Sequence, residues 1–174
     1  MHPEHLIQLI SRAKTLPHQT SSQSCGLKFV FPANDLAVRK TLADTIKALR
    51  FLDFSSEEYG TIELVLAEAM NNIIEHAYAD DPDGMVELEI TPSDSGLKCI
   101  LSDDGQPMPD GNIPIGNLPS KNVGPTSVVN DLPEGGFGWF LIRDLARDLQ
   151  HTRQGGKNIL TFRIAAGPQN LRSN

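Results

Sequence analysis

Three polar side chains that could perform chemistry are spaced four residues apart in the segment 61–78. Glu68, Asn72 and His76 stand at i, i+4 and i+8, so in a helix they lie one above another on one face. A carboxylate can act as a general base, and an amide oxygen is a hard, neutral ligand that suits Mg²⁺. Because burying such groups unpaired is costly, their place beside an apolar stripe predicts either a solvated helix edge or a polar cavity.

Two glycine-bearing segments further along the chain could complete a site. Asp103 ends an apolar, strand-like run and precedes Gly105, so its carboxylate could accept hydrogen bonds from an exocyclic amine. Gly136 and Gly138 open a helical segment, where free N–H groups and missing Cβ atoms favour a phosphate. Each segment alone also fits an ordinary turn or hinge, and neither the P-loop nor the Rossmann pattern is present.

The elements that must position these groups are expected in the order strand, helix, helix, strand, strand, long loop, helix, strand, strand. Asn34 is expected to cap one helix, and Ser55 or Ser56 the central helix. Consecutive strands joined by tight turns pair antiparallel, and grouped helices cover one sheet face. The sequence therefore predicts an α+β fold, a two-layer α/β sandwich with a mostly antiparallel sheet and its helices on one face. The expected strands are 25–31, 85–91, 97–102, 150–153 and 158–165, and the expected helices are 35–52, 61–78 and 137–149.

The pattern also divides the chain into parts. Residues 1–24 are expected to form an N-terminal arm with a short helix and a linker, and residues 167–174 a frayed tail. The domain between them covers 25–166. Within it, residues 105–136 show no period and hold six of the twelve prolines, which is typical of a lid.

Composition narrows the classes of partner. A net charge of −7 argues against nucleic acid and anionic membrane, since both demand a basic surface. No apolar run reaches the length of a membrane span. The two isolated cysteines, Cys25 and Cys99, suggest free thiols in a reducing cytoplasm.

In combination and in this order, the motifs resemble those of the GHKL ATPase superfamily, which has the Bergerat fold. Within it, the chain is similar to the small serine-protein kinases that act as bacterial anti-sigma factors. The resemblance covers about residues 25–165, although Pro107 replaces a common glycine and Trp139 stands where a smaller aliphatic residue is usual. It rests on an E-A-x-x-N helix, a D-x-G loop and a G-G-x-G-x-x-L-I helix start: Glu68, Ala69, Asn72; Asp103, Gly105; Gly135, Gly136, Gly138, Leu141 and Ile142.

The resemblance implies a role for each matching residue. Asn72 should hold Mg²⁺ bridging the phosphates of ATP or ADP, and Glu68 should activate a serine hydroxyl. Asp103 should bind the adenine amino group, and Gly105, Gly136 and Gly138 should shape the lid and cradle the phosphates.

Three positions are less closely defined by the resemblance. Thr161, on the last strand, is expected to support Asp103 through water. Asn71 is an alternative to Asn72, although the helix register and the family spacing both favour Asn72. His76 resembles a family position, but we expect it to be a structural histidine.

The function that the resemblance implies is ATP-dependent phosphorylation of a STAS-type anti-anti-sigma protein, with a sigma factor as a second partner. The branch often forms homodimers. The alternative is a nucleotide-regulated binding module that sequesters a partner without kinase activity, and it would need the same motifs.

Overall fold

A computed structural model of the chain describes residues 26–79, 83–108, 111–114 and 137–167. The predicted arm at 1–24, most of the predicted lid at 105–136 and nearly all of the predicted tail lie outside these residues. The boundaries expected for those three segments stay predictions.

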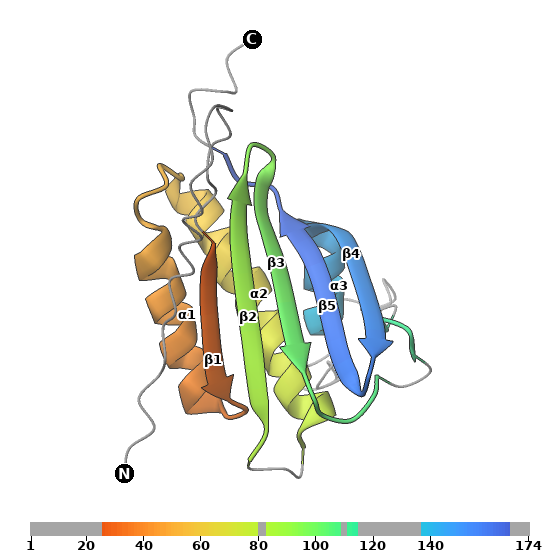
Figure 1. Cartoon of the computed structure of the whole chain (residues 1–174). Helices are drawn as coiled ribbons and strands as arrows, with labels where there is room; N and C mark the ends of the chain where they lie inside the picture. Colours follow the sequence, from red (N-terminus) through yellow and green to blue (C-terminus); the bar gives the residue numbers. More distant parts are fainter. Residues whose placement is uncertain (1–25, 80–82, 109–110, 115–136, 168–174) are drawn as a thin grey trace, which may run out of the picture.

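The described residues form one five-stranded sheet and three helices, and the predicted fold class is confirmed. The sheet has the order β1-β2-β3-β5-β4, and every neighbouring pair is antiparallel. Figure 1 shows the three helices together on one face of the sheet. The elements are β1 (Leu27–Pro32), α1 (Asp35–Leu49), α2 (Ser56–Ala77), β2 (Met85–Ser93), β3 (Gly96–Asp103), α3 (Phe137–Leu145), β4 (Ala146–Gln154) and β5 (Lys157–Ile164).

Side-chain caps fix where the first two helices begin. Asn34 Oδ1 accepts the backbone N–H of Ala37 at 3.0 Å, as expected for the cap of α1. At the start of α2, Ser55 and Glu58 form a capping box: the Ser55 N–H donates to Glu58 Oε2 at 2.8 Å, and the Glu58 N–H donates to Ser55 Oγ at 3.2 Å.

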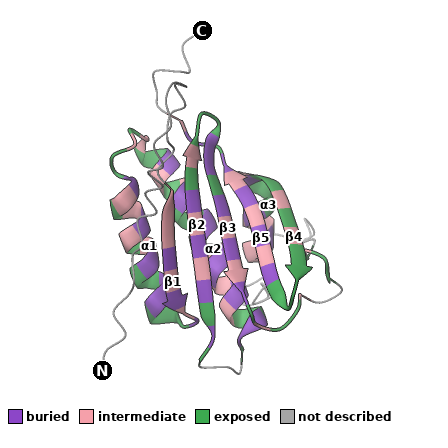
Figure 2. Ribbon diagram, in the orientation of Figure 1, coloured by how far each residue is buried: buried purple, intermediate pink, exposed green. Residues whose placement is uncertain are grey.

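The core lies between the helices and the sheet. The predicted apolar stripe of α2 is buried, and Ile62, Leu66 and Met70 expose none of their surface. In Figure 2, buried and less buried residues alternate along the strands. That alternation is the period of two expected when one sheet face packs against helices. The stripe packs in one cluster with Leu88, Leu101 and Phe162 of the sheet.

The helix predicted over 137–149 is four residues too long. α3 ends at Leu145, and Ala146 already pairs with Ile164 as the first residue of β4. The pairing is irregular between Arg147 and Gln150, where Asp148 adopts φ 54°, in the left-handed region. Leu145 and Leu149 are four residues apart and imitate a helical period, although Leu149 lies on a strand.

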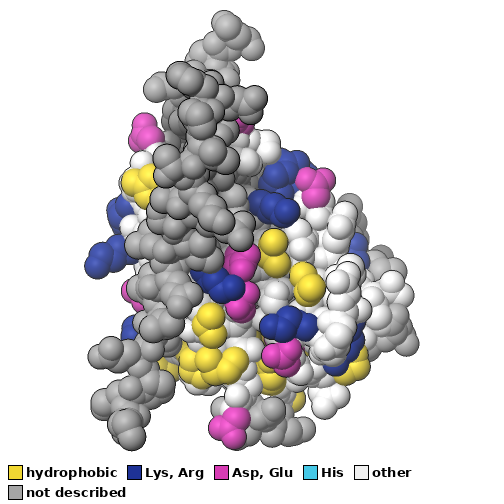
Figure 3. Space-filling model, in the orientation of Figure 1, with side chains coloured by type: hydrophobic (Ala, Val, Ile, Leu, Met, Phe, Trp, Pro, Cys, Tyr) yellow, Lys and Arg dark blue, Asp and Glu magenta, His cyan; other side chains and the backbone are white. Residues whose placement is uncertain are grey.

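The opposite sheet face carries mixed charge. Lys28 Nζ lies 2.7 Å from a Glu87 carboxylate oxygen and 2.9 Å from one of Glu89. Figure 3 shows basic, acidic and apolar side chains interspersed over the visible part of this face. Within the described ranges, no helix is both long and apolar enough to span a membrane.

Candidate functional site

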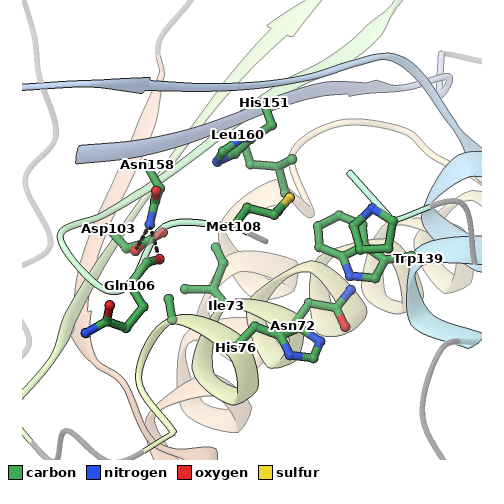
Figure 4. A pocket seen from close by; sticks show the side chains of 12 residues that line it. Asn72, Ile73, His76, Asp103, Gln106, Met108, Trp139, His151, Asn158 and Leu160 are labelled. Carbon is green, nitrogen blue, oxygen red and sulfur yellow. Dashed lines mark hydrogen bonds between the residues drawn. The ribbon is translucent and has the colours of Figure 1, made fainter. Parts of the chain in front are cut away.

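A cavity lies between α2, the start of α3 and the ends of β3, β4 and β5. Its polar groups gather at two ends, and apolar side chains lie between them, as Figure 4 shows. The cavity brings together groups that are far apart in the sequence. The lining residues are Asn72, Ile73, His76, Ala77, Asp103, Gln106, Met108, Pro114, Trp139, His151, Asn158 and Leu160.

Asp103 closes one end of the cavity as a buried, hydrogen-bonded carboxylate. It is the last residue of β3 and pairs in register with Asn158 of β5. Its Oδ1 accepts Asn158 Nδ2 at 2.8 Å and the Gly105 N–H at 3.0 Å. Among the described residues no hydrogen bond is recorded to Oδ2, so that oxygen is available to a ligand's donor.

The electrostatics of Asp103 reflect a balance of opposing effects. Burial raises the pKa of the Asp103 carboxyl above its ordinary value. The hydrogen bonds from Asn158 and Gly105, and the positive charge of Arg153, act against this rise. These donors therefore favour the ionised carboxylate, which is the form that accepts a hydrogen bond from an amine.

Hydrogen bonds hold the loop after Asp103 on two sides. The Gln106 N–H donates to the Ala77 carbonyl at 2.9 Å, and the Gln106 carbonyl accepts Asn158 Nδ2 at 2.9 Å. Arg153 donates to the Gly105 carbonyl at 3.1 Å and also to Asn158 Oδ1. A Cβ on Gly105 would stand 2.5 Å from the Ala77 carbonyl oxygen, so glycine permits this close approach to α2.

At the other end of the cavity, α2 and α3 approach each other at a glycine. A Cβ on Gly138 would stand 2.6 Å from Glu68 Oε2 and 3.1 Å from Asn72 Oδ1. The structure therefore brings Glu68, Asn72 and Gly138 to one place. Asn72 is 7% exposed, and its Nδ2 has no hydrogen-bond partner in the described part of the chain.

The two neighbouring asparagines of α2 face different surroundings. Asn72 lines the cavity with Asp103, whereas Asn71 lines a separate groove beside α1, together with Arg39 and Glu75. Their positions favour Asn72 over Asn71 for any role toward a ligand in the cavity.

Thr161 and His76 lie on the expected elements, but their surroundings do not fit the roles expected of them. Thr161 is on β5, but the buried residues of that strand alternate from Asn158 to Leu160, so Thr161 points to the opposite sheet face. Asn158, not Thr161, reaches Asp103 directly. His76 lines the cavity but is exposed, with no recorded hydrogen bond among the described residues, so it is not a buried structural histidine.

Sequence reasoning overlooked Asn158, although a signal was present. It is a polar residue at a position where β5 otherwise places apolar side chains toward the helices. Gly136, predicted beside Gly138, lies outside the described residues.

Residues 31–164 match the family described as the histidine kinase-like ATPase domain. The chain belongs to this family, and its fold agrees with that membership.

Similar proteins make the relationship more specific. The serine-protein kinase RsbW of Bacillus cereus (strain AH820) is 29% identical over 126 residues, which is 71% of this chain and 72% of that protein. RsbW of Bacillus thuringiensis (strain Al Hakam) is 26% identical over 126 residues, with the same coverage. A crystal structure of the RsbU and RsbW domains of a Mycobacterium tuberculosis protein matches 82% of this chain, with a TM-score of 0.53 and 16% identity. This chain spans 33% of that longer chain, and the likeness supports the fold alone.

The residues of the cavity fit a nucleotide. Asp103 offers a free carboxylate oxygen to an amine, and Ile73, Met108 and Leu160 offer apolar surface to a ring. At the far end, Asn72 has a buried amide without a partner, and the missing Cβ of Gly138 leaves room. The described residues hold no cluster of three His, Cys, Asp or Glu side chains for a metal.

Proposed function

We propose that this chain is an ATP-dependent serine-protein kinase that phosphorylates a STAS-type anti-anti-sigma protein and also binds a sigma factor. One observation carries the proposal: Glu68, Asn72 and Gly138 meet at one end of a cavity whose other end holds Asp103. The similarity to serine-protein kinases named RsbW supports the same activity. Because ATP and sigma factors are intracellular, the proposal places the chain in the cytoplasm.

Asp103 is the proposed recognition group for the base. Its Oδ2 would accept the adenine amino group, while Asn158 and Gly105 hold Oδ1 in place. A carboxylate fixed in this way pays little conformational entropy when the ligand binds. The apolar middle of the cavity would enclose the ring.

Asn72 and Gly138 are the proposed residues at the phosphates. The Asn72 amide oxygen would hold Mg²⁺, and Gly138 would let the phosphates approach the start of α3. Bound ATP would supply the phosphoryl group, and Mg²⁺ would neutralise the charge on its phosphates. Gly136 is also proposed to cradle the phosphates.

Glu68 is the proposed catalytic base. Its side chain is partly exposed and lies beside Asn72 and Gly138, so it can be reached by a serine of a second protein. Its Oε2 would accept the proton of that serine hydroxyl. A correctly placed base of this kind contributes about 10²–10⁴-fold in rate.

The test is a transfer assay with labelled ATP, Mg²⁺ and a purified STAS-domain protein from the same organism. We expect phosphoserine on the STAS protein with the wild type. With Glu68→Gln we expect a loss of at least about 100-fold in rate, with ADP affinity within about twofold of the wild type. Glu63→Gln is the matched control, because Glu63 is an exposed carboxylate on the same helix.

Other outcomes would change the assignment. Transfer at the wild-type rate by Glu68→Gln would remove Glu68 from the mechanism. If the wild type binds ADP and the STAS protein but makes no phosphoserine, the alternative of a nucleotide-regulated binding module replaces the kinase.

A further inference from the structure

Buried polar atoms without partners are concentrated in the cavity. In the described part of the chain there are four such side-chain atoms, and three belong to residues lining it: Asn72 Nδ2, Trp139 Nε1 and His151 Nε2. The fourth, Thr45 Oγ1, lies on α1. A buried donor that has lost water without gaining a partner is costly, so this concentration indicates groups that a ligand satisfies.

The proposed mechanism uses Asn72 but neither Trp139 nor His151, and of these two it is Trp139 that lies beside Asn72 (Figure 4). It is 3% exposed, lies in the first turn of α3 directly after Gly138, and is the only tryptophan of the chain. A smaller aliphatic side chain at this position would leave no polar atom to satisfy. An indole N–H can only donate, so its partner must be an acceptor.

The position of Trp139 indicates which part of a nucleotide it meets. Figure 4 shows Trp139 beside Asn72, at the end of the cavity away from Asp103. Apolar Ile73, Met108 and Leu160 lie between the two ends. If the base occupies the Asp103 end, the charged acceptors that reach the Asn72 end are phosphate oxygens.

We propose that Trp139 is a specificity-determining residue of the nucleotide site, whose indole N–H donates a hydrogen bond to a phosphate oxygen. The inference rests on the proposed nucleotide site and adds to it a residue that binds the phosphates and not the base. A hydrogen bond to a charged acceptor is stronger than one between neutral groups. The chain should therefore bind ligands with phosphate more tightly than ligands without it, and the difference in affinity should exceed the part that Mg²⁺ contributes.

The variant Trp139→Phe tests this proposal, since it removes the N–H and keeps a large aromatic ring. Calorimetry would give the dissociation constants of ADP and of adenosine, each with Mg²⁺ and with EDTA. We expect ADP to bind about tenfold more weakly than to the wild type in both conditions, and adenosine to bind within about twofold of the wild type. The adenosine result serves as an internal control, because general damage to the cavity would weaken both ligands.

Each remaining outcome overturns the proposal in a different way. Equal weakening of ADP and adenosine would place the indole against the base or in a purely structural role. A loss seen only with Mg²⁺ would place the N–H on the Asn72 amide. No change for either ligand would show that the N–H contributes nothing to binding. If the wild type itself fails to bind ADP, the nucleotide site and the proposal fail together.

Tryptophan emission of the wild type gives a second readout. Because Trp139 is the only tryptophan, its emission reports this cavity alone. We expect saturating ADP to change the emission spectrum more than saturating adenosine does. Identical changes would contradict a contact between the indole and phosphate.

Discussion

The two ends of the cavity differ in how completely their polar groups are satisfied. At the Asp103 end, Asn158, Gly105 and Arg153 form a connected set of hydrogen bonds that also holds the loop after β3. At the Asn72 end, two buried nitrogens, on Asn72 and Trp139, have no partner among the described residues. Apart from Asp103 Oδ2, the Asp103 end is hydrogen-bonded within the protein, whereas we expect a ligand to supply the partners at the Asn72 end.

This difference matches the parts of a nucleotide. A base presents a fixed pattern of donors and acceptors, which a rigid and prearranged carboxylate recognises well. Phosphates change in number and charge during a transfer, so the groups that meet them must be free to bind before and after the step. We therefore expect substitutions at the two ends to have different consequences.

The largest effect is expected from Gly138→Ala. The added Cβ would stand 2.6 Å from Glu68 Oε2 and about as close as packing allows to the Asn72 amide, 3.1 Å from its oxygen. The partly exposed carboxylate can move aside, but only by leaving its place beside Asn72. A misplacement of about 1 Å can cost about 100-fold in rate, so we expect a loss of that size in transfer to the STAS protein.

Gly60→Ala is the matched control for Gly138→Ala. Gly60 lies in α2 with nothing within 4 Å of an added Cβ. Alanine there should raise the free energy of unfolding by about 0.5–1 kcal/mol and leave transfer unchanged. Equal transfer rates in both alanine variants would show that the space at Gly138 has no role in the reaction.

Asn158→Ala should weaken both the hydrogen bonds at the Asp103 end of the cavity and the binding of the adenine base there. It leaves Asp103 Oδ1 with one donor fewer and the Gln106 carbonyl without its donor. We expect unfolding to become easier by about 1–3 kcal/mol, measured by urea denaturation. We also expect affinity to fall by a similar factor for adenosine and ADP. Trp139→Phe, in contrast, is expected to weaken ADP alone, so the two variants distinguish the two ends of the cavity.

The same variant should change the pH dependence of binding. The ionised Asp103 accepts the amine, so ADP affinity should fall as the pH falls through the Asp103 pKa, which burial raises. Asn158 opposes that rise, so its removal should raise the pKa further and move the loss of affinity to higher pH. Dissociation constants measured from pH 7 downward would show this, and an unchanged profile would contradict it.

The smallest effect is expected from Arg153→Gln. Arg153 donates to Gly105 and Asn158 but is itself exposed, so solvent and salt screen its charge. We expect ADP affinity to fall about twofold to threefold at low salt and by less at high salt. A loss as large as that of Asn158→Ala would mean that Arg153 contacts the ligand directly.

The sequence predicted the parts of the structure that depend on local signals. The order of strands and helices, the caps at Asn34 and Ser55, and the buried stripe of α2 all follow from short patterns. Asn72 could be placed beside that stripe for the same reason. The end of α3 could not be predicted, because a strand and a helix both accommodate the leucines at 145 and 149.

The remaining features of the site depend on contacts between segments that are distant in the sequence. Whether Asn158 or Thr161 reaches Asp103 depends on the register of β3 and β5, which the sequence of neither strand specifies alone. The contact between Gly138 and Glu68 likewise depends on how α2 and α3 pack. The family resemblance suggested that these motifs share a site, and in the structure Asn72 and Asp103 line one cavity, with Gly138 beside Asn72.

The most direct test of the central claim is the shift in melting temperature caused by ADP, measured with and without Mg²⁺. Ligand at a hundredfold over its dissociation constant should add about 2.7 kcal/mol. For a chain of this size that corresponds to roughly 5–10 °C. We expect a Mg²⁺-dependent shift that Asn71→Ala retains and Asn72→Ala loses. No shift in the wild type, or the same shift in both variants, would contradict a nucleotide site built around Asn72.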